Sequence, residues 1–231
     1  KGLLLYDTAS ETYRRIRIFP DESDTYGYAS VNAIMLDSEK TLWALTSDNG
    51  ACYMPANLQA IHYCKLPIND DGNRVNSFIE EDDNIIIGAE NGLWKYRQSD
   101  GTLAKYPLSY NRKDITNVNI ITRIDGRMWI GTNGNGAYTS DMSTGAGRNY
   151  KHDETAMGTI PSNDVLSIQK RSIGRYEIGT RFGLCEYRPE SDSFTPRVTI
   201  GSTSTVNTTC EDNDGNLWVA TSNMGLYKHS T

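Results

Sequence analysis

Five copies of one pattern recur along this chain, and that repeat constrains the fold more than any other feature. Each copy opens on a Val and contains a core that resembles the pattern Trp-x-Gly/Ala-Thr, which four of the copies match at two or more positions. The Trp position of that core is filled in turn by Trp43, Ile86, Trp129, Glu177 and Trp218. Successive copies are therefore offset by 43, 43, 48 and 41 residues. A period near 40–45 residues is typical of β-propeller blades, in which every repeat forms one small sheet.

Positions within the repeat predict individual strands. The alternating Val-Asn-x-Ile stretch indicates the innermost strand, and the almost continuously apolar run around the Trp position indicates a second strand buried on both faces. A glycine six or seven residues later opens the third strand, where a positive φ suits it. These glycines are Gly50, Gly92, Gly136, Gly183 and Gly225. The dipeptides Asp125-Gly126 and Asp214-Gly215 predict tight hairpins between the first two strands. Outer strands are expected within Ile61–Leu66, Leu103–Leu108 and Ser193–Thr199.

The repeat predicts an all-β propeller without helices, made of about five four-stranded antiparallel blades and a partial one in a single domain. The predicted segments are 1–19 (the end of a preceding blade), 20–66, 67–108, 109–152, 153–199 and the partial blade 200–231. Strand-three patterns occur at both ends of the chain, in Leu3–Tyr6 and Leu226–His229, so a clean five-bladed ring would carry that strand twice. We therefore expect the chain to belong to a larger array. Trp43, Trp129 and Trp218 should be buried at equivalent positions.

Composition narrows the possible partners. The formal net charge is −6, and no basic stripe is present, which disfavours nucleic acid and anionic membrane surfaces as partners. The apolar runs are too short to cross a bilayer. None of the four cysteines has metal-site spacing, and Cys52 and Cys64 leave two possibilities open, a disulfide across one hairpin or buried thiols. We expect neither a metal nor another cofactor.

Catalytic motifs are also scarce. His152, beside Asp153 and Glu154, could act as a general base in a lyase, but a solvated charged loop has the same composition. The run Asp212–Asn216 resembles the start of a calcium loop, although the required Glu is missing, which favours a plain hairpin turn. The sequence therefore predicts no catalytic residues and a chain that is not itself an enzyme.

Two sets of residues are candidates for ligand binding. The second residue of the inner strand is an amide in four copies, namely Asn32, Asn76, Asn119 and Asn207. Such a ring of amides could bind sugar hydroxyls, or it could join each blade to the next through hydrogen bonds to the backbone. The second set lies in irregular loops at the same ends of the strands. Tyr28, Tyr110 and Phe182 could offer aromatic platforms, and Arg74, Arg112 and Arg181 could bind an acidic group.

The last copy carries a family resemblance. Residues Val206–Tyr227 follow almost throughout the pattern V-x-x-I-x-E-D-x-x-G-N-L-W-V-A-T-x-x-x-G-L-Y, which resembles the two-component regulator propeller repeat. The resemblance covers essentially the whole chain and is weakest in the fourth copy, where Glu177 replaces the Trp. It implies an array of about seven blades in the periplasmic sensor domain of a hybrid two-component histidine kinase. It also implies an oligosaccharide ligand, control of glycan-utilisation genes and a homodimeric receptor. Contact with the membrane would be made only by a helix of the parent receptor.

Two alternatives stay open at this point. Streptogramin lyases resemble the same repeat, so a propeller lyase or another glycan-active enzyme is the first alternative. A protein-binding scaffold is the second, because a fold does not fix a function. A lyase would need a His or Tyr base converging with a metal or an Arg cluster, whereas a scaffold would show a broad apolar patch.

Overall fold

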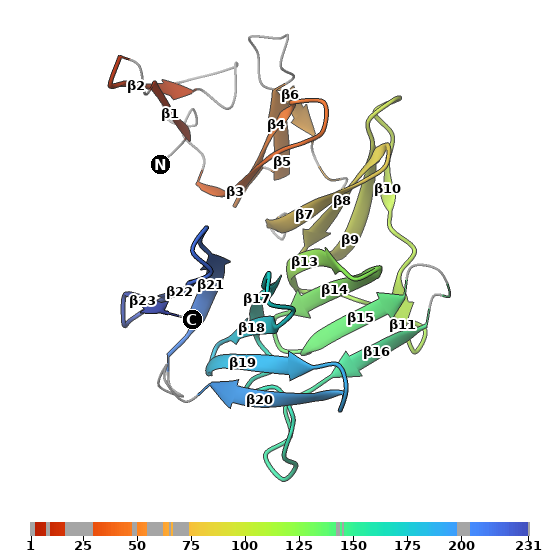
Figure 1. The fold of residues 1–231 in the computed structure, drawn as a ribbon. Coiled ribbons are helices and arrows are strands. Elements are labelled where there is room, and N and C mark those ends of the chain that lie inside the picture. Colours follow the sequence, from red (N-terminus) through yellow and green to blue (C-terminus); the bar gives the residue numbers. More distant parts are fainter. Residues whose placement is uncertain are drawn as a thin grey trace. The chain divides into compact units, whose positions relative to one another are not determined.

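The computed structural model describes residues 3–7, 10–16, 30–47, 50–54, 62–64, 66, 74–141, 144, 146–197 and 204–230. Its described residues form 23 β-strands and no helix. The chain divides into two compact units, residues 1–105 and residues 106–231, and each unit is described by itself (Figure 1).

The first unit contains a two-stranded sheet and two complete blades. The two-stranded sheet pairs β1 (Leu3–Asp7) with β2 (Thr12–Ile16). The first blade comprises β3 (Val31–Leu36), β4 (Leu42–Thr46), β5 (Gly50–Met54) and β6 (His62–Cys64). The second blade comprises β7 (Val75–Glu81), β8 (Asn84–Ala89), β9 (Gly92–Arg97) and β10 (Leu103–Lys105).

The second unit contains a short hairpin and three blades. The hairpin pairs β11 (Ser109–Tyr110) with β12 (Lys113–Asp114). The third blade comprises β13 (Val118–Ile124), β14 (Arg127–Thr132), β15 (Ala137–Asp141) and β16 (Gly147–Tyr150). The fourth comprises β17 (Val165–Lys170), β18 (Tyr176–Thr180), β19 (Gly183–Arg188) and β20 (Ser193–Arg197). The fifth has the three strands β21 (Val206–Glu211), β22 (Leu217–Thr221) and β23 (Leu226–His229).

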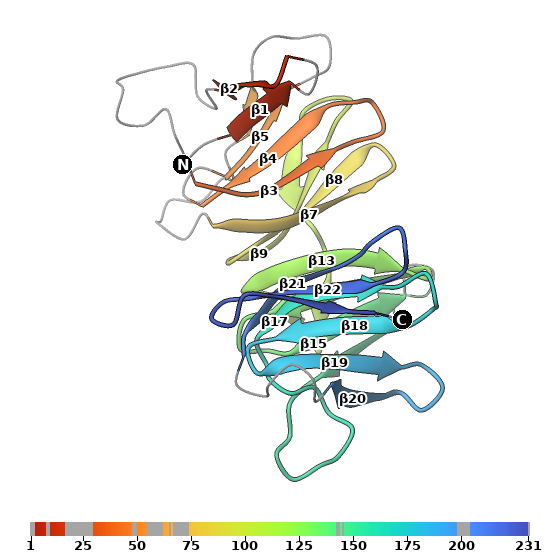
Figure 2. The ribbon, with the colours of Figure 1, turned by 60° about the vertical axis from the view of Figure 1, so that its left-hand side comes forward.

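The predicted fold class is confirmed. Every blade is an antiparallel meander in which strands follow each other in chain order. Figure 2 shows the inner strands β13, β17 and β21 of the second unit near one another, and β17 contacts both of the others. The strands of each sheet fall inside the segments predicted for them. The exact segment boundaries and the single-domain assignment stay predictions.

Local backbone geometry explains why glycine and Asp-Gly recur. Gly50, Gly92 and Gly183 open their strands with φ of 84°, 122° and 101°, a region that side chains with a Cβ avoid. At the hairpin of the third blade, Asp125 and Gly126 both have positive φ, as the predicted tight turn requires. The same prediction is wrong for Asp214-Gly215. There β21 and β22 are joined by five residues, 212–216, and only the glycine has a positive φ.

The first and third blades each pack on the blade that follows them through the Trp position. Trp43 is 1% exposed and lies in one apolar cluster with Val75 and Ile87 of the second blade. Trp129 is 2% exposed and lies in a corresponding cluster with Val165 and Ile178 of the fourth blade. Burial of this side chain therefore joins neighbouring sheets.

Trp218 departs from the prediction of burial, because it is only half-buried. It lies on the same face of the fifth blade as Leu226, which is 62% exposed. Among the described residues of the second unit, no further blade covers that face. The opposite face is the packed one, since Val219 is fully buried in a cluster with Leu184 of the fourth blade.

A second contact joins blades at the hairpin end of the inner strand. The residue five positions after the opening Val bonds to the first hairpin turn of the preceding blade. Glu80 accepts hydrogen bonds from the Ser38 amide and hydroxyl (3.2 and 2.8 Å), and Glu211 accepts the same pair from Ser172 (2.6 and 3.0 Å). Between the third and fourth blades the donor and the acceptor are exchanged. There Lys170 of the fourth blade donates a hydrogen bond to Asp125 of the third blade at 2.6 Å.

The structure answers whether the described cysteines form a disulfide. Cys52, Cys185 and Cys210 carry thiols and form no disulfide. On the adjacent strands β5 and β6, Cys52 lies opposite Tyr63, whereas Cys64 lies opposite Ala51. The two cysteines are thus out of register by one residue, and the disulfide alternative is wrong.

Replacing Trp43 or Trp129 with Ala should lower the free energy of unfolding by about 3–5 kcal/mol, because a large buried side chain leaves a cavity between two blades. Trp218→Ala should cost clearly less, because that side chain is half-buried. Urea denaturation of the three variants measures the difference. Equal losses at all three positions would contradict the packing described above.

Candidate functional site

The start of each inner strand carries a β-bulge, and this bulge positions the first set of predicted residues. Pairing of the inner strand with its neighbour skips the residue that follows the opening Val in all five blades. That residue is an Asn in four blades and Leu166 in the fourth. A bulge re-aims a side chain away from the regular ladder. The bulge does not depend on the amide, because the fourth blade forms it with Leu166.

The amides of this set bond to the protein itself. Asn32 donates to the carbonyl oxygen of Val75 in the next blade (3.3 Å), and Asn119 donates to that of Val165 (3.1 Å). The side-chain oxygen of Asn32 also accepts a hydrogen bond from the hydroxyl of Ser47 (3.0 Å). Asn207 accepts a matching bond from Ser222 (2.8 Å). This geometry is that of blade-to-blade joints, and a ligand-binding role for Asn32, Asn76, Asn119 and Asn207 stays a prediction.

Loops from two parts of each blade meet beside these amides, as expected. In every blade the residue after the second strand donates its N–H to the carbonyl of the residue before the opening Val. The pairs are Ser47 with Ser30, Glu90 with Arg74, Asn133 with Asn117, Arg181 with Asp164, and Ser222 with Thr205. Side chains at these two positions are therefore neighbours on one rim of each blade.

Two of the predicted arginines occupy these rim positions, and each is already paired with an acid. Arg74 lies 3.6 Å from Glu90, and Arg181 lies 2.6 Å from Asp164. The two ion pairs use the same two positions with the charges exchanged. Both arginine side chains are more than half exposed, so the pairs add little to stability. Phe182, next to Arg181 in the chain, is 52% exposed.

Two further predicted residues, Tyr110 and Arg112, belong to the β11–β12 hairpin. Tyr28 lies outside the described residues. Arg112 lies in the turn of the β11–β12 hairpin, where Asn111 and Arg112 both have left-handed backbone angles, with φ of 50° and 63°. Two consecutive residues in that region form the tight turn that the twist of a hairpin favours.

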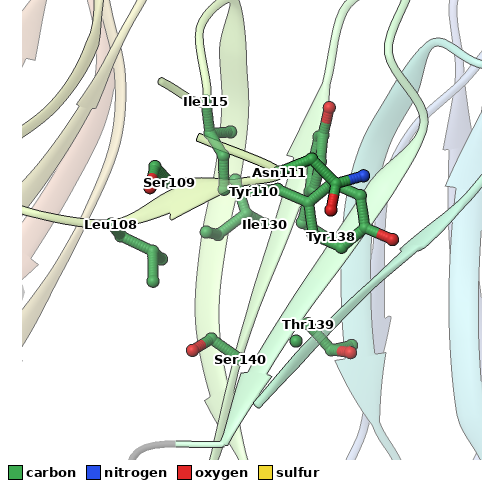
Figure 3. A pocket seen from close by; sticks show the side chains of 10 residues that line it. Leu108, Ser109, Tyr110, Asn111, Ile115, Ile130, Tyr138, Thr139 and Ser140 are labelled. Carbon is green, nitrogen blue, oxygen red and sulfur yellow. The ribbon is translucent and has the colours of Figure 1, made fainter. Parts of the chain in front are cut away.

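This hairpin borders two hollows in the outer part of the third blade. The first has a volume of about 220 Å³ and is lined by the hairpin and by β14, β15 and the start of β16 (Figure 3). The second has a volume of about 340 Å³ and lies along β16 and the turn before β20. Tyr110 lines both of them. We call the two hollows together the Tyr110 trough.

Aromatic rings and amides dominate the trough. The rings of Tyr110 and Tyr138 meet edge to face with centroids 5.6 Å apart, and Figure 3 shows them side by side. Burial raises the pKa of Tyr138, which a hydrogen bond from the Asn149 side chain opposes only in part, so this phenol is neutral at physiological pH. The side-chain oxygen of Asn149 is buried and has no hydrogen-bond partner.

One carboxylate fixes the wall of the second hollow. Asp192 accepts hydrogen bonds from the hydroxyls of Tyr150 (2.7 Å) and Tyr187 (2.9 Å), and it forms an ion pair with Arg148. Burial raises the pKa of Tyr150, which keeps its proton available for donation to Asp192. These contacts tie the outer strands of the third and fourth blades together.

Sequence reasoning found Tyr110 but missed Tyr138, Asn149 and Tyr150. The third strands carry no signal for Tyr138, because the same position holds Trp94 in the second copy and Tyr227 in the fifth. The fourth strands do differ, since the position of Asn149 holds Tyr63, Lys105 and Pro196 in the first, second and fourth copies. A comparison of the outer strands, copy by copy, would have identified Asn149.

The weak fourth copy contains a buried charge cluster instead of a Trp. In the first and fifth blades an Asp accepts a hydrogen bond from the Trp indole, Asp37 from Trp43 and Asp212 from Trp218, each at 2.8 Å. In the fourth blade Arg171 occupies the Asp position and Glu177 the Trp position, and their side chains are 1% and 0% exposed.

Further charges complete that cluster. Glu177 lies 2.7 Å from Arg197 and 3.8 Å from Arg171, and Arg171 also bonds to Glu211 and to the carbonyl of Gly215. Burial raises the pKa of Glu177, and the neighbouring guanidinium groups oppose that shift only in part. The cluster replaces an apolar joint with an ionic one.

The remaining motifs are explained by local hydrogen bonds. The Nδ1 atom of His152 lies 2.7 Å from the carbonyl of Ile160. Hydrogen bonds from Trp218 and Asn216 lower the pKa of Asp212 to about 2, so its oxygens cap the turn that resembles a calcium loop. The described residues contain no cluster of three potential metal ligands. None of their segments is a helix long and apolar enough to span a membrane.

Comparison with known proteins supports the repeat and the fold. Residues 200–223 match the two component regulator propeller family, which confirms the resemblance found in the last copy. No curated protein matches the sequence.

Solved structures share the fold at low identity. The extracellular domain of the putative hybrid two component system BT3049 from B. thetaiotaomicron matches 98% of this chain, with a TM-score of 0.75 and 16% identity. That of the putative one component system BT4673 from the same organism matches 87%, with a TM-score of 0.72 and 21% identity. PorZ of Porphyromonas gingivalis, a surface component of the type-IX secretion system, matches 87% with a TM-score of 0.63 and 13% identity. This chain spans 33%, 26% and 32% of those three chains.

Asn119→Leu should lower the free energy of unfolding by about 1–3 kcal/mol, because the carbonyl of Val165 loses its donor. Asn207→Leu is the matched control and should cost less, because the exposed Asn207 bonds to Ser222 within its own blade. Chemical denaturation measures both. Unchanged stability of Asn119→Leu would contradict the role of this amide as a joint.

Glu177→Leu should cost about 3–5 kcal/mol, because it removes the fully buried carboxylate that Arg171 and Arg197 share. The double substitution Arg171→Asp with Glu177→Trp recreates the Asp–Trp hydrogen bond of the first blade and should recover most of that loss. Denaturation of the single and double variants tests this. A double variant as unstable as the single one would show that the fourth blade cannot accept the Asp–Trp pair.

Proposed function

We propose that this chain is a ligand-sensing propeller segment from the extracytoplasmic part of a hybrid two-component sensor histidine kinase. The observation that carries the proposal is the match of residues 200–223 to the two component regulator propeller family. The shared fold with extracellular domains of such systems, over 98% of this chain in one case, adds support. We place the segment in the periplasm and the receptor in a homodimer, held in the membrane by a helix of the parent protein.

The ligand that we propose is an oligosaccharide, whose binding controls genes for glycan use. An acidic chain with net charge −6 is poorly suited to polyanions, whereas exposed tyrosines and amides suit neutral polyhydroxylated ligands. The segment binds and does not turn over its ligand. His152 donates from its Nδ1 atom to the carbonyl of Ile160, which leaves Nε2 able to accept a proton, so the lyase alternative is tested below at this residue.

The test is a binding screen with plant and host oligosaccharides, run in parallel on this chain and on the complete extracytoplasmic region. At least one glycan should raise the thermal midpoint, since a ligand at 100 times its Kd stabilises the folded state by about 2.7 kcal/mol. Calorimetric titration should confirm binding. A panel without any binder to either protein would contradict the oligosaccharide proposal.

The same samples test the absence of turnover. Neither reducing ends nor unsaturated products should accumulate on prolonged incubation with any bound glycan. Products that form with the wild-type chain, and that disappear in the variant His152→Ala, would contradict a pure sensor and favour the lyase.

A further inference from the structure

The Tyr110 trough has features of a binding site that ordinary blade packing does not need. No charged side chain lines its first hollow, and all residues of that lining are described. The edge-to-face pair of Tyr110 and Tyr138 presents aromatic surface to the cavity (Figure 3). Beyond Tyr110, the second hollow exposes polar groups of β16. An apolar ring surface beside uncharged polar groups suits a ligand that has both characters.

One residue in the lining of the first hollow has no side chain. Gly147 begins β16, and a Cβ at this position would come within 2.8 Å of the carbonyl oxygen of Thr139 and about 4.0 Å of the Tyr110 ring. Any other residue at position 147 would therefore displace the backbone of β15 next to the hollow.

An unsatisfied acceptor lies next to this space. The side-chain oxygen of Asn149 is buried without a partner, although its amide group bonds to the hydroxyl of Tyr138. Buried acceptors without a donor are rare and costly in folded proteins. A ligand hydroxyl that donates to Asn149 would remove that cost.

We propose that the Tyr110 trough binds a neutral pyranose unit of an oligosaccharide. The sugar ring packs its C–H face on Tyr110 and Tyr138, and the next unit passes Tyr110 toward Asn149. This inference rests on the proposed function, in which the segment senses an oligosaccharide, and it assigns the site within this chain.

The charges around the trough favour a neutral sugar over an acidic one. The second hollow is lined by Arg148, Lys151 and Asp192, and Arg148 is already paired with Asp192. An acidic sugar in the first hollow would meet no cation in the lining. A neutral ring loses less hydration there than a carboxylate would.

The walls of the trough are preorganised. Asp192 is held by Tyr150, Tyr187 and Arg148, and the tight turn at Asn111 and Arg112 sets the direction of the hairpin that carries Tyr110. A wall that is fixed before binding reduces the entropy lost when the ligand arrives. Arg112, selected from the sequence as a ligand residue, is adjacent in the chain to Asn111, which lines the first hollow.

The experiment follows the NMR signals of ring-labelled tyrosines in the whole chain. Methyl glucopyranosides, galactopyranosides and mannopyranosides are titrated first, then the best glycan of the panel above, with galacturonic acid as the anionic comparison. A neutral sugar should shift the signals of Tyr110 and Tyr138, and Tyr110→Ala should weaken its binding at least tenfold. Tyr110→Phe should keep most of the affinity. Tyr13→Ala is the matched control, since Tyr13 is 73% exposed on β2.

The outcomes separate this inference from the proposed function. Glycan binding that is equal in the wild-type chain and in Tyr110→Ala would overturn the site and leave the sensor proposal intact. A response to galacturonic acid alone would overturn the preference for a neutral sugar. No response to any glycan would overturn both proposals. Should Tyr110→Ala fail to fold, Asn149→Leu provides the second test, with the same loss of affinity expected.

Discussion

Packing of one side chain against the opening Val of the next repeat is the contact on which the blades depend. A single four-stranded sheet leaves an apolar face exposed, and a large ring at the Trp position covers that face when the next sheet arrives. Trp43 meets Val75 in this way, and Trp129 meets Val165. Hydrogen bonds from Asn32 and Asn119 to the carbonyls of the same valines then fix the register of the two sheets. Burial of apolar surface stabilises the contact between two blades, and the hydrogen bonds of the amides determine how the two sheets are aligned.

The fourth blade shows how far this joint can change. Glu177 fills the Trp position and is as buried as Trp43, but it meets Arg171 and Arg197 instead of an apolar cluster. The bulge residue is Leu166 in the same blade, so the amide joint is also absent. A buried ion pair adds little to stability, but removal of one partner is costly because it leaves the other charge buried and unpaired. The fourth blade thus gains specificity for the fifth, whose Glu211 completes the cluster.

Most of the fold could be predicted because it is encoded locally and five times over. The glycine that opens each third strand follows from a backbone angle, and Asp125-Gly126 follows from turn geometry. Predictions failed where the conformation or the burial of a residue depended on contacts with other parts of the fold. Burial of Trp218 requires a sheet on its outer face, and the Asp214-Gly215 turn is reshaped by Asp212, which binds Asn216 and Trp218. Neither effect is visible in the repeat itself.

The candidate site was harder to predict for a related reason. Repeated residues are constrained by the joints, so they reveal the scaffold, and the five-fold signal drew attention to amides that bond to the protein. The trough arises where the third blade departs from the pattern, through Asn149 and through the β11–β12 hairpin, which contacts the outer strand β16. Tyr110 and Tyr138 are far apart in the sequence and belong to different elements. Their contact depends on how the chain between the second and third blades folds. In such a scaffold, ligand recognition depends on the segments that do not repeat.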